Sequence, residues 1–327
     1  DKTITRDNLE DEIISTDQIE DLSVTKEKIG AAEVVTAHIE DEAITVDKLE
    51  LTARKEIICI PVSFESGEQG ENTISIPYDF KITGKELEAA ITPKTKMLIF
   101  STPCNPTGSV YTKEELYDLA CVLKKYPHIV VISDEIYEHI NFIGKHESLA
   151  QFPEVYNQVV TINGVSKAWA MTGWRLGYIG APKVIADACN KVQGQFTSGT
   201  CSITQKATIA AMEADPIVLK DMITAFNNRR KLVLAALNDM PGVKANVPVG
   251  AFYVFPEIAS FFGKSYNGFT VNNADDMCLY LLSEALVALV TGDAFGDPNC
   301  IRISYAASEE TLTKAMDRIK QALAKLA

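Results

Sequence analysis

Short apolar runs suited to buried strands alternate with stretches of helical periodicity between residues 96 and 192. The runs KMLIFSTP, HIVVISDE, VVTINGV and RLGYIGAP are rich in branched and aromatic residues. TKEELYDLACVLKKY and PKVIADACNKV instead place apolar residues on one helical face, and the first begins with a capping-box pattern. Because uninterrupted apolar strands are typical of parallel sheets covered on both faces, the chain is predicted to form an α/β fold around a mostly parallel sheet.

The pattern changes after residue 214. PIVLKDMITAFNNRRKLVLAALNDM predicts one long amphipathic helix. It is followed by GAFYVFPEI, a loop rich in Gly and Asn near residues 263–274, the strand-like CIRISYA and a terminal helix. We therefore expect a large domain over residues 80–214, and then the long helix with a smaller α+β C-terminal domain over residues 215–327.

Residues 1–54 form an acidic, repetitive segment of a different character. Apolar positions recur at a shift of about twenty residues, so that Ile4, Val24 and Ile44 align, and IED occurs twice. The segment resembles the VTxxKIxxxAVTxxKI repeats of phage tail-fibre-like proteins, which assemble as trimers. The alternative is an acidic arm that is partly disordered or helical. Residues 55–79 contain two apolar β-type runs around a turn and form a β-rich junction.

Charge and cysteine usage argue against several classes of function. A formal net charge of −13 disfavours a nucleic-acid partner. The 7 cysteines include no CxxC pair and there are only 4 histidines, so we expect reduced thiols and no metal site. No signal-peptide pattern is visible, and the most apolar stretch, LYLLSEALVALV, is too short to span a bilayer. These features predict a cytoplasmic protein with no membrane partner.

Polar residues stand at the ends of consecutive predicted strands, where open α/β sheets bind their ligands. Asn105 follows the first strand, Asp134 ends the second with Tyr137 close behind, Lys167 follows the third, and Arg175 precedes the fourth. Each has an ordinary explanation taken alone: a turn former, a helix cap, a core aromatic residue, or a solvated surface charge. Their arrival in order at strand ends favours one shared binding site.

The motifs NPTG, SDEIY, NGVSKAWAMTGWR, GAFYVFP and RISYA together resemble those of class I aspartate aminotransferases. The resemblance extends from about Phe80 to Ala327 and covers about three quarters of the chain. It implies fold type I, the cofactor pyridoxal 5′-phosphate, and transfer of an amino group from aspartate or a similar amino acid to 2-oxoglutarate. It also implies small-molecule amino acid and 2-oxo acid substrates and a homodimer, although a trimer would follow if the N-terminal repeat controls assembly.

The resemblance assigns roles to the residues of the lysine and carboxylate motifs. Lys167 matches the lysine that bonds covalently to the cofactor and then moves a proton during transfer, which requires a neutral amine. Asp134 matches the carboxylate that keeps the pyridine nitrogen protonated. Arg175 matches the arginine that binds the cofactor phosphate through its guanidinium fork.

Three further assignments complete the expected site. Tyr137 and Asn105 match the pair that hydrogen-bonds the phenolic oxygen of the cofactor ring. Arg302 matches the arginine that binds the substrate α-carboxylate, with Asn105 beside it. The resemblance thus implies Lys167, Asp134 and Tyr137 as catalytic residues, and it implies no metal ligand.

Other parts of the family pattern are not found in residues 1–79. These parts are a Gly/Ser/Thr loop that caps the cofactor phosphate, an aromatic ring stacked on the pyridine, and a tyrosine donated to the partner subunit. We therefore expect a junction near IPYDFKIT between a non-family segment and an incomplete aminotransferase, with weak cofactor binding. The alternative functions are an inactive, truncated aminotransferase fold and a structural module in which the fibre-like arm drives trimerisation.

Overall fold

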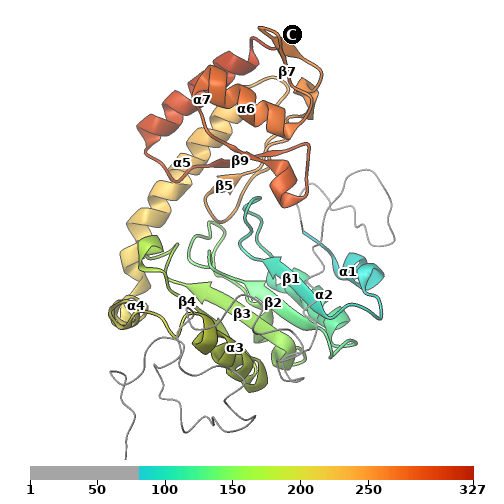
Figure 1. Ribbon diagram of the computed structural model, residues 1–327, viewed down its shortest axis with the longest axis vertical. Coiled ribbons are helices and arrows are strands. Elements are labelled where there is room, and N and C mark those ends of the chain that lie inside the picture. The colour runs from blue at the N-terminus through green and yellow to red at the C-terminus, as the bar shows by residue number, and fades with distance from the viewer. Residues whose placement is uncertain (1–80) are drawn as a thin grey trace, which may run out of the picture. The chain divides into compact units, whose positions relative to one another are not determined.

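The computed structural model describes residues 81–327 (Figure 1). The acidic repeat and the β-rich junction expected from the sequence lie outside these residues. The expected boundary after residue 214 falls within the described part, where a helix ending at Glu213 is followed by a short 3-10 turn.

A four-stranded sheet forms the first half of the described chain, in the order β1-β2-β3-β4 (Figure 1). Its strands are β1 (Met97–Ser101), β2 (Val130–Asp134), β3 (Val159–Gly164) and β4 (Gly177–Gly180). The first three are parallel, and β4 is antiparallel to β3. The prediction of a mostly parallel sheet is therefore confirmed. In its register Ser101 lies opposite Asp134, and Asp134 opposite Ile162, so the carboxyl ends of β1 to β3 share one edge.

Two N-terminal helices pack beside this sheet, α1 (Gly84–Ala90) and α2 (Lys113–Leu123). The capping box predicted at the start of α2 is present, since Thr112 accepts from the backbone N–H of Glu115 and the Glu115 side chain accepts from that of Thr112. Leu116, Leu119 and Leu123 of α2 are fully buried in one hydrophobic cluster with Val131 of β2. The apolar residues that the sequence spaces along one side of α2 thus pack against the sheet and cover one of its faces.

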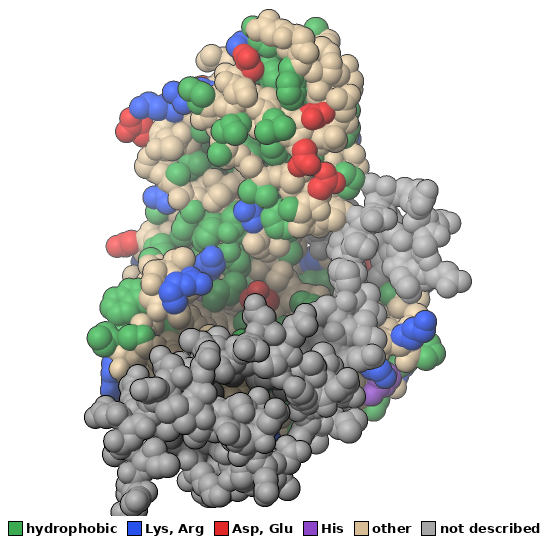
Figure 2. Space-filling model, in the orientation of Figure 1, with side chains coloured by type: hydrophobic (Ala, Val, Ile, Leu, Met, Phe, Trp, Pro, Cys, Tyr) green, Lys and Arg blue, Asp and Glu red, His purple; other side chains and the backbone are tan. Residues whose placement is uncertain are grey.

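The other helices of this half leave much apolar surface exposed. They are α3 (Lys183–Phe196) and α4 (Ser202–Glu213). Phe196 is 84% exposed and Ile203 71%, and every residue of β4 is exposed. Cover on both faces, expected from the apolar strands, is therefore not found over β4 among residues 81–327. Hydrophobic side chains also gather on the face seen in Figure 2, over the region of α4 and the start of α5.

The second half begins with the 3-10 turn Pro216–Leu219, which runs into α5 (Lys220–Asn238). The sequence predicted one continuous α-helix from Pro216, and the structure differs in having a 3-10 turn at the start of that range. Asp215 accepts from the backbone N–H of Ile217 and Pro216 begins the turn, and 3-10 turns are frequent at the N-termini of α-helices.

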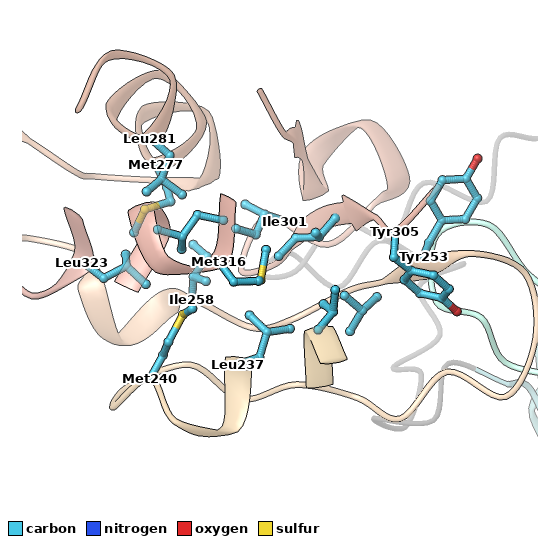
Figure 3. Packing of buried hydrophobic residues seen from close by; sticks show 14 of the residues in the cluster. Leu237, Met240, Tyr253, Ile258, Met277, Leu281, Ile301, Tyr305, Met316 and Leu323 are labelled. Carbon is cyan, nitrogen blue, oxygen red and sulfur yellow. The ribbon is translucent and has the colours of Figure 1, made fainter. Parts of the chain in front are cut away.

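A small antiparallel sheet and two helices complete this half (Figure 1). The sheet has the order β5-β9-β8, and a separate hairpin joins two further short strands. The elements are β5 (Tyr253–Val254), β6 (Ser265–Tyr266), β7 (Phe269–Thr270), α6 (Ala274–Ala285), β8 (Val290–Thr291), β9 (Ile301–Ser304) and α7 (Glu309–Leu323). Helices α5, α6 and α7 bury their apolar faces together with β5 and β9 in the larger of two hydrophobic clusters. Tyr253 and Tyr305 lie at one end of this cluster, with their hydroxyls pointing away from the aliphatic side chains (Figure 3).

The loop before β5 makes backbone hydrogen bonds to two loops at the edge of the large sheet. The carbonyl of Gly108 accepts from the N–H groups of Val249 and Gly250, and Ala251 N–H donates to the Ile140 carbonyl. Gly108 has φ of +68°, and a Cβ there would lie 2.3 Å from the Pro248 side chain. Only glycine therefore allows this close approach, which brings the GAFYVFP segment up to the NPTG loop.

Candidate active site

The carboxyl edge of the large sheet carries three of the predicted site residues. Asp134 is the last residue of β2, Asn105 lies in the loop after β1, and Lys167 follows the end of β3. Asp134 is also tied to the first loop, because its backbone carbonyl accepts from the N–H of Thr102 at 3.0 Å. The parallel register thus brings these residues to one edge, as the sequence predicted.

Asp134 presents a partly buried carboxylate near a lysine. Burial raises the pKa of Asp134, the Ile136 backbone N–H lowers it at an Oδ1 distance of 3.1 Å, Glu135 raises it and Lys167 lowers it. Among residues 81–327 the carboxylate has no partner within ion-pair distance. Such a group can accept a hydrogen bond from a protonated ligand atom and gain from pairing with its charge.

Lys167 lies beside the ring of Tyr137. Its Nζ is 5.7 Å from the centroid of that ring, and it makes no hydrogen bond or ion pair with the described residues. Tyr137 is 4% exposed, and burial raises the pKa of its phenol well above the ordinary value. The Tyr137 hydroxyl therefore stays protonated at neutral pH and can donate a hydrogen bond.

Arg302 reaches this edge from the small sheet. Its guanidinium donates from Nη1 to Asn105 Oδ1 at 2.9 Å, although the two residues are 197 positions apart. The guanidinium carbon lies 4.7 Å from the ring centroid of Tyr253 and 4.7 Å from that of Phe295. Its Nε is buried and has no hydrogen-bond partner among residues 81–327. The guanidinium thus lies close to two aromatic rings, with donor capacity left for an anion.

Arg175 is not brought into this group. It is exposed, with φ of +54° at the end of the 3-10 turn Thr172–Trp174, and donates to the Thr172 carbonyl at 2.9 Å. It lines an open hollow of about 720 Å³ together with residues of α3 and α4. The other five predicted site residues do not line that hollow. The expected position just before a strand is found, but the structure gives Arg175 no contact with them.

A family model, that of aminotransferase class I and II, matches residues 66–319. The chain belongs to this family. The match begins before residue 80, where the sequence motifs placed the start of the resemblance, and it includes part of the predicted junction. No comparison bears on the fibre-like resemblance of residues 1–54.

Similar proteins support the assignment to the aminotransferase family. A bifunctional aspartate aminotransferase and glutamate/aspartate-prephenate aminotransferase of Petunia hybrida is 48% identical over 254 residues, which are 76% of this chain and 53% of that protein. The crystal structure of the aspartate aminotransferase from Rhizobium meliloti is 42% identical, with a TM-score of 0.73 over 76% of this chain and 63% of that one. The Thermus thermophilus aspartate aminotransferase with maleate is 37% identical, with a TM-score of 0.68 over 75% of this chain and 61% of that one. The fold-type-I expectation is confirmed, and this chain spans between about half and two thirds of these proteins.

Sequence reasoning missed two aromatic residues of this candidate site. Tyr253 and Phe295 enclose Arg302, and the hydroxyl of Tyr253 lies 3.0 Å from that of Tyr137. Tyr253 stood within the quoted motif GAFYVFP, so the motif contained the signal without revealing the direction of the side chain. Phe295 lies in the 3-10 turn Gly292–Phe295 and carried no signal of its own.

A buried carboxylate beside Asp134 was also missed. Glu135 is 2% exposed, and its Oε1 accepts from the hydroxyls of Ser133 at 2.9 Å and Ser148 at 2.7 Å. Its Oε2 lies 2.8 Å from Nε2 of His146. Glu135 is therefore satisfied by protein groups, whereas Asp134 faces the lysine. The doubled carboxylate in SDEIY was the available signal, and side-chain alternation separates the two roles.

Two absences hold for the part of the chain that the structure describes. Within residues 81–327, His, Cys, Asp and Glu side chains form no group of three or more that could hold a metal ion. No helix in this range has the length and apolar character needed to cross a membrane.

Proposed function

We propose that this chain belongs to a pyridoxal-phosphate-dependent aminotransferase that moves an amino group from aspartate, or a similar amino acid, to 2-oxoglutarate. The observation that carries the proposal is the meeting of Lys167, Asp134 and Tyr137 at the sheet edge with Arg302 bonded to Asn105. Family membership and the printed activities of the relatives support it. Because the chain spans only part of those relatives, the activity is proposed for the complete protein.

The residues present fit the chemistry of pyridoxal phosphate. The amine of Lys167 has no partner among residues 81–327 and suits an aldehyde, while the Asp134 carboxylate suits a protonated ring nitrogen. The Tyr137 hydroxyl and the Asn105 amide suit an anionic phenolic oxygen, and the exposed Arg175 guanidinium suits a phosphate. The group would supply an electron sink for the carbon that loses its proton.

The chain's own residues would divide the remaining work. Lys167 Nζ would take a proton from the substrate α-carbon as a general base. It would then deliver that proton to a different carbon as a general acid. Asp134 would keep the ring nitrogen protonated, because its carboxylate would pair with the positive charge. The partial burial of Asp134 would strengthen this attraction by limiting solvent screening. Tyr137 would hold its hydroxyl proton toward the phenolic oxygen, since its raised pKa prevents ionisation at neutral pH.

A direct assay tests this function. We expect the protein, supplied with pyridoxal phosphate, aspartate and 2-oxoglutarate, to form glutamate and oxaloacetate in equal amounts. Leaving out either substrate should stop the formation of both products. A panel of amino acids then defines the donor. Absence of glutamate formation, with cofactor bound, would favour the inactive-fold alternative.

Arg302 is proposed to bind the α-carboxylate of the substrate, with Asn105 fixing one end of its guanidinium. We expect Arg302→Lys to raise the KM of both the amino acid and the 2-oxo acid by roughly tenfold to a hundredfold, because a lysine cannot make the bidentate bond. Steady-state kinetics with both substrates measures this change. Arg318→Lys on α7, outside the proposed site, is the matched control. Unchanged KM values in Arg302→Lys would contradict the assignment.

Partners and assembly are proposed from the family and from the sequence repeat. Small-molecule amino acids and 2-oxo acids are the expected partners, in a cytoplasmic homodimer. The repeat in residues 1–54 favours a fibre-like trimerising segment as a second candidate for assembly. The mass of the protein in solution distinguishes dimer from trimer.

A further inference from the structure

Tyr253 touches two groups of the candidate site at once. Its hydroxyl lies 3.0 Å from the hydroxyl of Tyr137, and either oxygen can be the donor. Its ring meets the Tyr137 ring edge to face, with centroids 5.9 Å apart. The same ring supports the guanidinium of Arg302, whose carbon lies 4.7 Å from the ring centroid.

The strand register explains the contact with Arg302. Tyr253 of β5 pairs with Ser304 of β9, so the two side chains lie on the same face of the small sheet. Arg302 precedes Ser304 by two positions and therefore shares that face, as a diagonal neighbour of Tyr253. Tyr253 is 7% exposed, at the end of the hydrophobic cluster where its hydroxyl points away from the aliphatic side chains (Figure 3).

We propose that Tyr253 is a positioning residue that links the cofactor side of the site, through Tyr137, to the substrate side, through Arg302. The inference rests on the proposed function and adds to it a residue to which the family resemblance assigned no role. The hydroxyl and the ring of Tyr253 do separate work, so they can be tested separately.

The hydroxyl orients Tyr137. Each phenol carries one proton, so when Tyr137 donates to a ligand oxygen, Tyr253 must donate to the oxygen of Tyr137. Accepting that bond polarises Tyr137 and makes it a stronger donor. The ring restricts Arg302. Together with Phe295 it keeps the guanidinium plane in the direction that meets Asn105, which lowers the ordering needed when a carboxylate binds.

Two variants separate these contributions in the cofactor-free protein. Tyr253→Phe removes only the hydroxyl, and Tyr253→Leu removes the ring as well. Phenylglyoxal modification of Arg302, followed by peptide mass spectrometry, should proceed at least about twofold faster in Tyr253→Leu, and at the wild-type rate in Tyr253→Phe. Arg175 is the internal reference, since its exposed guanidinium does not contact Tyr253. Equal Arg302 rates in all three proteins would overturn the role of the ring.

The hydroxyl is followed by carbon-13 at tyrosine Cζ, with the Tyr137 signal assigned from Tyr137→Phe. In Tyr253→Phe that signal should move, because the hydrogen-bond partner is gone while the aromatic contact remains. A Tyr137 signal at its wild-type position would overturn the role of the hydroxyl. Thermal melting and the Arg175 modification rate identify a variant that has lost its fold. If Tyr253→Leu does not fold, Tyr253→Phe still tests the role of the hydroxyl.

With pyridoxal phosphate bound, the hydroxyl has a second readout. The pH midpoint of the cofactor absorbance change should rise in Tyr253→Phe by about half to one pH unit, because Tyr137 then stabilises an anionic oxygen less well. Tyr137→Phe should move it further in the same direction. A wild-type protein without cofactor absorbance would contradict the proposed function, whereas the cofactor-free measurements would still decide the role of Tyr253.

Discussion

Replacing Lys167 with alanine is expected to abolish covalent attachment of pyridoxal phosphate and to lower the transamination rate by about a thousandfold or more. Lys167 is proposed both to bond to the cofactor and to move the proton, so its loss removes two contributions together. The structure places its Nζ beside the Tyr137 ring, with no hydrogen bond to the described residues. Borohydride reduction followed by peptide mapping should locate the phosphopyridoxyl group on Lys167 in the wild type and on no lysine in the variant.

Lys183→Ala is the matched control for this experiment. Lys183 lies on the exposed side of α3, where its side chain is 87% exposed and pairs with Asp187 at 2.7 Å. Exposed pairs of this kind contribute little to stability, so the control should keep both the modification and the rate. The assignment would be wrong if the phosphopyridoxyl group appeared on another lysine, or if Lys167→Ala retained wild-type activity.

Asp134→Ala is expected to reduce transamination by about a hundredfold or more, a larger loss than Asn105→Ala, for which we expect about tenfold. The carboxylate is proposed to set the charge of the ring nitrogen, and this charge is needed throughout the reaction. Asn105 accepts one hydrogen bond from Arg302 and is proposed to donate a second to the phenolic oxygen, and both bonds would only adjust the site. Rates measured at saturating cofactor compare the two variants, and equal residual activities would contradict these roles.

The raised pKa of Asp134 predicts a stability effect that needs no cofactor. Burial, the largest cause, makes the folded chain bind the Asp134 proton more tightly than the unfolded chain does. The stability that this group contributes is therefore fully present below the ordinary pKa of 3.8 and is lost as pH rises through the folded value. Asp134→Asn, which cannot ionise, should raise the melting temperature of the cofactor-free protein at pH 7. The difference should disappear as pH falls below 3.8, and a lower melting temperature at pH 7 would contradict this account.

Local sequence patterns were sufficient to predict most of the secondary structure and the site residues at the carboxyl edge of the large sheet. The apolar runs became β1 to β4, and the capping box of α2 formed at Thr112 and Glu115. Asp134 and Lys167 reached the same edge because parallel strands align their carboxyl ends. The turn Pro216–Leu219 before α5 differs from the predicted continuous helix, since helical periodicity does not distinguish a proline-started 3-10 turn from an α-helix.

The sequence by itself determined where each strand ends and which polar residue stands there, because these depend on neighbours along the chain. Only the tertiary structure decided that Arg302 meets Asn105 from 197 positions away, that Tyr253 lies between Arg302 and Tyr137, and that Arg175 lines a hollow with residues of α3 and α4. Residue spacing gives the face of a strand on which a side chain stands, but not the element that packs against that face. In this fold the Gly108 loop hydrogen-bonds to Gly250, and this close approach holds the small sheet against the edge of the large one.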